Sequence, residues 1–147
     1  MRFLAKRPPP RADAAAAPGS GAEPAAPAST KARGDAAEAL ALRHLEAAGL
    51  RLLTRNYRTP GRGGGEIDLV MQARDGTVVF VEVRARSSES HGGALASIGA
   101  TKRARIVFAA RHYLLRHASP PPCRFDVVLV GPAGVQWLPA AFDADGA

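Results

Sequence analysis

The chain lacks several features that define common protein classes. It holds a single cysteine, Cys123, which excludes an internal disulfide and a cysteine-based zinc site. No apolar run approaches the ~20 residues that a membrane-spanning helix needs. The basic N-terminus is followed by prolines and alanines, not by the continuous apolar segment of a signal peptide. These absences predict a protein of the reducing cytoplasm that has no membrane partner.

Acidic residues are scarce relative to basic ones. The chain has 13 Asp and Glu against 20 Lys and Arg, a formal net charge of +7, and arginine far outnumbers lysine. A charge of this sign favours polyanionic partners, nucleic acid first.

Residues 1–32 are rich in Ala, Pro, Gly and Ser and contain almost no large apolar side chain. Such a segment cannot bury enough surface to fold, so we predict a disordered basic tail. The tail would either strengthen nonspecific contact with nucleic acid or act as a solubilising leader. A single domain is expected over residues 33–140, followed by a frayed C-terminus over residues 141–147.

Hydrophobic periodicity predicts the secondary structure of the domain. Helices are expected over residues 34–49 and 101–117, where apolar residues recur at helical spacing. Strands are expected over five short runs that alternate with period two or are rich in β-branched residues. Those runs cover residues 50–58, 66–70, 78–84, 124–130 and 135–138. The order predicts an α/β fold with a mixed β-sheet flanked by helices.

The most informative segment holds Asp68 on one strand and Glu82 on the next. Between the strands, Arg74-Asp75-Gly76 predicts a three-residue hairpin loop with Gly76 at positive φ. In that register one face pairs Ile67 with Val83, Leu69 with Val81 and Met71 with Val79, and the other pairs Val70 with Phe80, Asp68 with Glu82 and Glu66 with Arg84. A two-residue loop would set Asp68 against Val83. A one-residue slip moves every side chain to the other face, so the first register is preferred.

Directly opposed side chains lie about 4.5–5.5 Å apart at Cβ. Two ionised carboxylates at that distance repel, so either one takes a proton or a cation lies between them. Hard divalent cations such as Mg²⁺ take oxygen ligands, few of them from protein. The pattern therefore predicts either a Mg²⁺-type site with Arg84 beside it, or a solvated charged face on which Glu66 and Arg84 pair.

The residues of this hairpin also resemble a known family. Residues 65–70 and 79–86 are similar to motifs of the YraN-like family of small uncharacterised bacterial proteins. By fold, that family belongs to the restriction-endonuclease-like PD-(D/E)xK nucleases. Residues 34–39 resemble its opening helix, residues 55–58 its first strand, Ile98 with Lys102 the start of its second helix, and residues 124–128 a later strand. The resemblance covers about residues 34–138.

The resemblance implies a nuclease-type site that holds Mg²⁺ or Mn²⁺. Asp68 matches the first acid of the motif and Glu82 the second, and Arg84 stands where the superfamily usually has lysine. Arginine can bind a phosphate through two hydrogen bonds but does not deprotonate near neutral pH. Lys102 is therefore the candidate that would supply the missing amine.

The helix acid Glu38 is open to two interpretations. From the residues alone, it is a favourably placed acid near a helix N-terminus. The resemblance instead matches it to an acid that some resolvase-like members add to the metal site. The implied metal ligands are Glu38, Asp68, Glu82 and the carbonyl of Val83.

We therefore expect a metal-dependent endonuclease-like protein that acts on DNA more than on RNA, branched DNA included. Arg84 would clamp the scissile phosphate, and recognition would depend on shape or backbone because no side chain stands out for base readout. Resolvase-like relatives often act as dimers, so the resemblance leaves a homodimer open, and no residue of this chain marks a dimer face. The candidates for contacts with the nucleic-acid backbone are Arg58, Arg62, Lys102, Arg103 and Arg105.

Two alternatives stay open. The first is a non-catalytic nucleic-acid-binding module with a degenerate nuclease site, in which Arg84 marks lost chemistry. The second is a protein-interaction adaptor whose basic tail is incidental.

Overall fold

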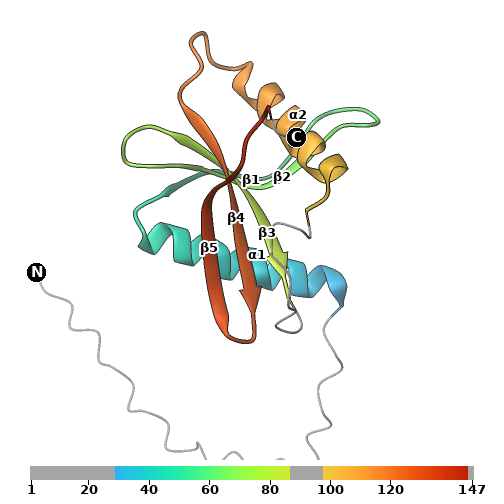
Figure 1. Cartoon of the computed structure of the whole chain (residues 1–147), viewed down its shortest axis with the longest axis vertical. Coiled ribbons are helices and arrows are strands. Elements are labelled where there is room, and N and C mark those ends of the chain that lie inside the picture. Colours follow the sequence, from blue (N-terminus) through green and yellow to red (C-terminus); the bar gives the residue numbers. More distant parts are fainter. Residues whose placement is uncertain (1–28, 87–97, 146–147) are drawn as a thin grey trace, which may run out of the picture.

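The computed structural model describes residues 29–86 and 98–145 of the chain. It contains two helices and five strands in the predicted order (Figure 1). Along the chain these are α1 (Thr30–Ala47), β1 (Arg51–Arg58), β2 (Glu66–Gln72), β3 (Val78–Ala85), α2 (Ala100–Leu114), β4 (Cys123–Gly131) and β5 (Gly134–Phe142).

The five strands form one mixed sheet in the order β1-β2-β3-β4-β5. All neighbouring pairs are antiparallel except β3 and β4, which are parallel. A parallel pair needs a crossover connection, and the segment that carries α2 provides it. The predicted α/β fold is therefore confirmed, with the mixed, helix-flanked sheet of a restriction-endonuclease-like protein.

The two helices cover opposite faces of the sheet (Figure 1). Ala37, Ala41 and Leu45 of α1 pack against alternate residues of β2, β3 and β4. The buried face of α2, which includes Ile106 and Tyr113, packs on the other side. The central strand β3 is consequently buried on both faces over Val78–Val81, which explains its nearly continuous apolar sequence.

Helix α1 begins at Thr30, inside the segment predicted as tail. The side chain of Ser29 caps it, because its Oγ accepts a hydrogen bond of 3.1 Å from the Ala32 amide. The helix ends where predicted: Gly49 has a φ of 99°, and the Leu50 amide donates to the Leu45 carbonyl. The predicted tail lies otherwise outside the described residues.

The predicted hairpin register is confirmed near the loop. Leu69 pairs with Val81, and the pairs that follow keep the same register as far as the turn. The Ala73 amide donates to the Thr77 carbonyl at 2.8 Å, and Gly76 has a φ of 91°. The loop is therefore the three-residue type, which sets the register of both strands.

Beyond Leu69 the prediction is wrong. The β2–β3 pairing ends there, so the expected Ile67–Val83 pair does not form and Ile67 packs in the cluster under α2. Strand β2 stays paired with β1 at this point, through Tyr57 and Ile67. The expected pair of Glu66 and Arg84 is also wrong, because Glu66 contacts Arg58 at 3.5 Å. The hairpin thus splays apart at the level of the two acids.

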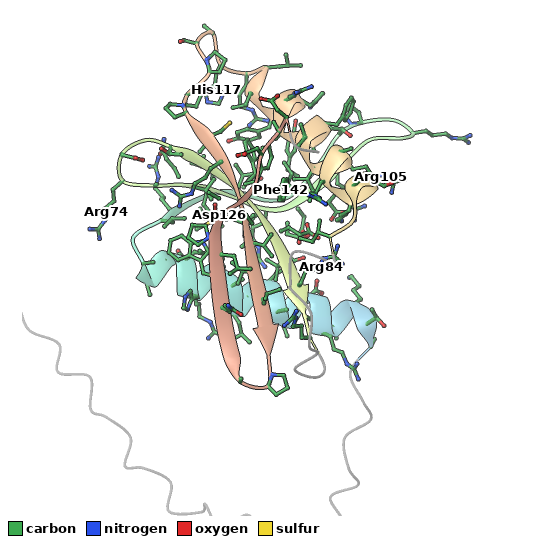
Figure 2. All side chains as sticks on the ribbon, in the orientation of Figure 1. Arg74, Arg84, Arg105, His117, Asp126 and Phe142 are labelled. Carbon is green, nitrogen blue, oxygen red and sulfur yellow. The ribbon has the colours of Figure 1, made fainter. Side chains whose placement is uncertain are left out.

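Strand β5 reaches Phe142, beyond the predicted end at residue 138 and into the segment predicted to fray. The reason is Asp126 on β4, which is fully buried (Figure 2). Its carboxylate accepts hydrogen bonds of 2.9 Å from both Trp137 Nε1 and the Ala140 amide. These bonds hold the last part of β5 on the sheet. Neither described helix is long and apolar enough to cross a membrane.

Candidate active site

Asp68 lies on β2 at the point where the hairpin splays. Its Oδ2 accepts a hydrogen bond of 2.8 Å from the Val83 amide of β3. The carboxylate thereby takes the place of a backbone partner that the β2–β3 pairing no longer supplies beyond Leu69. The bond fixes the orientation of Asp68 relative to the strand that carries Glu82.

Glu82 is almost completely buried, with 4% of its surface exposed. Two cations approach its Oε1: Arg84 Nε and Lys102 Nζ each lie 3.5 Å away. Its Oε2 is also buried and receives no hydrogen bond from an amide, hydroxyl or cationic group of the described residues, although the Asp68 carboxyl is close enough for the two acids to hydrogen-bond when one is protonated. A buried carboxyl oxygen without a partner is costly, so this atom marks a place where a ligand would stabilise the site.

The environment of the two acids changes their proton affinity. Burial, reinforced by the negative charge of Asp68, raises the pKa of Glu82 from 4.5 to about 8, although Lys102 and Arg84 oppose this change. Burial also raises the pKa of Asp68, against the hydrogen bond from the Val83 amide. Raised pKa values of neighbouring carboxyls are common at functional sites.

The structure brings together the predicted acids and both predicted cations. Lys102 comes from the first turn of α2, yet its ammonium group approaches the same Glu82 oxygen as Arg84 of β3. In Figure 2, Arg84 and Arg105 extend on the same side of the molecule. An amine and a guanidinium therefore flank the acid from two different elements.

Glu38 is the predicted metal ligand that comes from a helix. It lies on α1, and the pKa of its carboxyl is raised by partial burial and by the charge of Asp68, with Arg55 opposing. Over residues 29–86 and 98–145, no three Asp, Glu, His or Cys side chains gather closely enough to hold a metal ion. The hydrogen bond from the Val83 amide to Asp68 links β2 to the strand that carries Glu82, and metal ligation by Glu38, Asp68, Glu82 and the Val83 carbonyl stays a prediction.

A groove of about 340 Å³ adjoins the site on the side of α2, and we name it the α2 groove. Three of the five predicted nucleic-acid contacts line it, namely Arg58, Lys102 and Arg105. Arg62 is exposed in the neighbouring glycine-rich loop, and Arg103 is half-buried, but neither lines the groove. Glu66 lines it too, paired with Arg58.

The loop between β1 and β2 forms the floor of this groove. Thr59 closes the loop, since its Oγ1 accepts a hydrogen bond of 2.8 Å from the Gly65 amide. A Cβ on Gly65 would lie 1.9 Å from the Arg105 carbonyl, so glycine is required for α2 to approach. This approach brings Lys102 to the acids. Thr59 was not among the predicted site residues, because its only sequence signal is the run of glycines that follows.

Comparison with known proteins assigns the chain to a family. Residues 37–130 match the family described as "Uncharacterised protein family UPF0102". A UPF0102 protein of Paracidovorax citrulli (strain AAC00-1) is 75% identical over 115 residues, which cover 78% of this chain and 85% of the relative. A UPF0102 protein of Verminephrobacter eiseniae (strain EF01-2) is 63% identical over 145 residues, which cover 98% and 97%. The matched segment contains Asp68, Glu82 and Lys102.

Proposed function

The chain belongs to the UPF0102 (YraN-like) family, and we propose that it is a metal-dependent endonuclease that hydrolyses phosphodiester bonds in DNA, branched DNA included. One observation carries the proposal. Glu82 is a buried acid with a raised pKa and an unpartnered oxygen, beside Asp68, and two cations flank it. A purely structural ion pair needs neither a second acid nor an unpartnered oxygen.

The donor atoms suit Mg²⁺ or Mn²⁺. Both cations prefer oxygen ligands, and Mg²⁺ usually takes one or two carboxylates and completes its shell with water and phosphate. Asp68, Glu82 and the Val83 carbonyl would hold the ion, whose positive charge would stabilise the ionised form of both acids, which burial disfavours. When bound, it would lower the pKa of a water molecule and neutralise charge on the phosphate.

The chain's own side chains would orient and neutralise the substrate. The Val83 amide keeps the Asp68 carboxylate fixed, so its geometry is set before substrate binds. Arg84 can donate two hydrogen bonds to the oxygens of the scissile phosphate. Lys102 Nζ, on the other side of Glu82, would hydrogen-bond the attacking water or a phosphate oxygen. In that role it substitutes for the lysine that Arg84 replaces.

The non-catalytic binding module is the second candidate, and Arg84 favours it. With arginine at this position, a binding protein would keep phosphate affinity without hydrolysis. Its binding would depend on salt and be indifferent to Mg²⁺. Lys102 favours the nuclease, because its amine lies 3.5 Å from Glu82 Oε1 and could take the part of the lysine that is absent at position 84. Homodimer formation stays a prediction for either function.

Cleavage assays on the full chain test the proposal. Labelled duplex, single-stranded, flap and four-way-junction DNA would be incubated with Mg²⁺, with Mn²⁺ and with EDTA. We expect metal-dependent cleavage of at least one substrate by the wild type, abolished in Asp68→Asn. The matched control is Asp143→Asn, which changes an exposed aspartate outside the site and should cleave like the wild type. Equal cleavage by Asp68→Asn would refute the assignment.

A further inference from the structure

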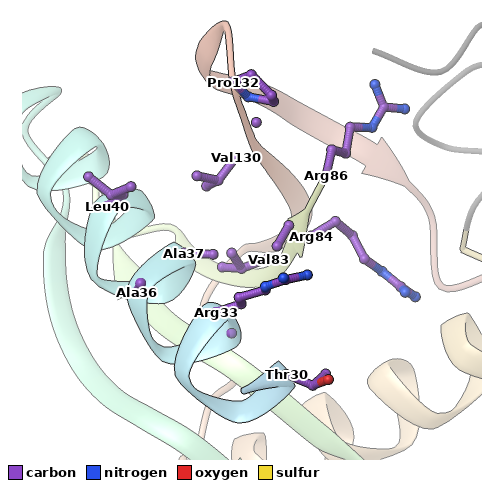
Figure 3. A pocket seen from close by; sticks show the side chains of 13 residues that line it. Thr30, Arg33, Ala36, Ala37, Leu40, Val83, Arg84, Arg86, Val130 and Pro132 are labelled. Atoms are coloured by element: carbon purple, nitrogen blue, oxygen red, sulfur yellow. The ribbon is translucent and has the colours of Figure 1, made fainter. Parts of the chain in front are cut away.

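A second and larger hollow lies on the other side of Arg84 (Figure 3). It has a volume of about 720 Å³ and lies between the N-terminal half of α1, the end of β3 and the β4–β5 turn. We name it the α1 pocket. Pockets of roughly 300–1,000 Å³ are typical of sites for small molecules, so this one is large enough for a nucleotide.

One side of the α1 pocket is aliphatic. Leu40, Val83, Val130 and Pro132 line it. Leu40 is 41% exposed and is one of three large apolar side chains exposed in the described part of the chain. An exposed leucine at the edge of a hollow offers an apolar surface that a flat apolar group can cover.

The other side of the α1 pocket is basic. Arg33 from α1, with Arg84 and Arg86 from the end of β3 and the residue after it, extend along this side (Figure 3). Guanidinium groups bind phosphate oxygens through paired, charge-assisted hydrogen bonds. The basic side of the pocket therefore fits a phosphate-bearing ligand better than a neutral apolar one.

Arg84 joins the α1 pocket to the candidate active site, because its Nε lies 3.5 Å from Glu82 Oε1. An occupant of the pocket would therefore be adjacent to the phosphate that the site attacks. A base within a duplex has both faces covered by stacking, so it can enter such a pocket only after leaving the stack.

We propose that the α1 pocket holds an unpaired nucleotide of the DNA strand, with its base against the aliphatic side and its phosphates against the arginines. The inference rests on the proposed nuclease function and deepens it by naming a substrate class. That class is DNA with an unpaired nucleotide beside the cut, as in a flap, a junction or a single-stranded end. Continuous duplex lacks the group that fills the pocket.

Two substitutions separate the contribution of the base to binding from the contribution of the phosphates. Leu40→Ser removes apolar surface from the pocket and leaves the arginines unchanged. Its matched control is Leu115→Ser, which replaces a 78%-exposed leucine at the C-terminal cap of α2 that does not line the pocket. Arg33→Gln removes a charge from the basic side. Urea unfolding of each variant establishes that the fold is intact.

The assay is fluorescence anisotropy of the full chain with labelled oligonucleotides in EDTA at physiological salt. The probes are an oligothymidine, the same backbone with abasic sites, and a blunt duplex. Leu40→Ser should weaken oligothymidine binding about fivefold, the loss expected from uncovering one to two methylene equivalents. It should leave abasic binding unchanged, and Leu115→Ser should change neither. Arg33→Gln should weaken binding to both single strands, because it removes a phosphate contact.

Equal effects of Leu40→Ser on the oligothymidine and on the abasic probe would overturn the inference. Wild-type binding to duplex that is as tight as binding to oligothymidine would overturn it as well. The measurement contains no divalent metal, so its result is independent of hydrolysis. Base-dependent binding without metal-dependent cleavage would support the pocket and refute the nuclease. Metal-dependent cleavage without base-dependent binding would support the nuclease and refute the pocket.

Discussion

Replacing Glu82 by glutamine tests the electrostatics of the candidate site through protein stability. Burial and the charge of Asp68 raise the pKa of Glu82 from 4.5 to about 8. Between these values the folded state binds more protons than the unfolded state, so the free energy of unfolding falls as the pH rises. At about 1.4 kcal/mol per pH unit, the extra proton held by the Glu82 and Asp68 pair should lower it by roughly 2 to 3 kcal/mol between pH 5 and pH 7.

Glutamine is isosteric with the protonated carboxyl and does not ionise, so Glu82→Gln should remove this dependence. Urea unfolding at several pH values can be followed by the fluorescence of Trp137, the single tryptophan. The variant should be the more stable protein at pH 7, and its advantage should shrink towards pH 5. The control is Glu46→Gln, which changes an exposed glutamate on α1 and should follow the wild-type curve.

Two further outcomes bear on the same argument. Parallel stability curves for the wild type and Glu82→Gln would refute the claim that the site destabilises the ionised acid. Mg²⁺ added at pH 8 should raise the free energy of unfolding of the wild type, because a ligand that binds only the folded state stabilises it. The same addition should leave Glu82→Gln almost unchanged.

Three more predictions follow from single contacts. Lys102→Ala should lower the cleavage rate roughly 10²-fold, the contribution of one positioned proton-transfer group, while the protein stays folded. Gly65→Ala should destabilise the protein by about 2 kcal/mol through overpacking and reduce cleavage, because its Cβ would lie 1.9 Å from the Arg105 carbonyl and force α2 away. Asp126→Ala should cost about 3 kcal/mol, because it removes the buried acceptor of three donors, the Trp137 indole, the Ala140 amide and the Arg124 guanidinium. Urea unfolding measures the loss of stability in both Gly65→Ala and Asp126→Ala.

Each of these changes has a control on the same chain. Arg111→Ala removes an exposed cation from α2 and should cleave like the wild type. A loss of cleavage as large as that of Lys102→Ala would contradict a specific role of Lys102 in the site. Gly99→Ala adds a Cβ at the start of α2 where no atom lies within 4 Å, and it should be tolerated. Asp143→Ala changes an exposed aspartate near the end of β5. It should leave stability unchanged, and a loss as large as that of Asp126→Ala would contradict the role given to the buried carboxylate.

The hairpin near Gly76 was predictable because two local signals agree there. The loop residues define a turn type, and the period-two pattern permits one register only. The same pattern could not show that the pairing stops at Leu69. The strand pairing ends where the Asp68 carboxylate accepts the hydrogen bond of the Val83 amide. Such a contact between a side chain and the backbone leaves no mark on the period-two pattern.

The position of Lys102 was suggested by resemblance but depends on packing between distant segments. It requires α2 to lie against Gly65, and that close approach leaves no trace in helical periodicity. The tail was predicted to reach residue 32 and the first helix to begin at residue 34, because alanine and proline dominate the preceding residues. The cap by Ser29 extends α1 to Thr30 instead, which brings Arg33 to the α1 pocket. Composition was therefore a poor guide at a helix end.

Metal binding by the carboxyl pair is the central claim, and calorimetry tests it most directly. Mn²⁺ would be titrated into the full chain bound to an uncleavable phosphorothioate DNA, so that a site completed by the substrate phosphate is included. The same titration would be run on the double variant Asp68→Asn/Glu82→Gln. We predict a saturable Mn²⁺ site in the wild type that is lost in the double variant. Identical titrations for the two proteins, with or without heat, would contradict it.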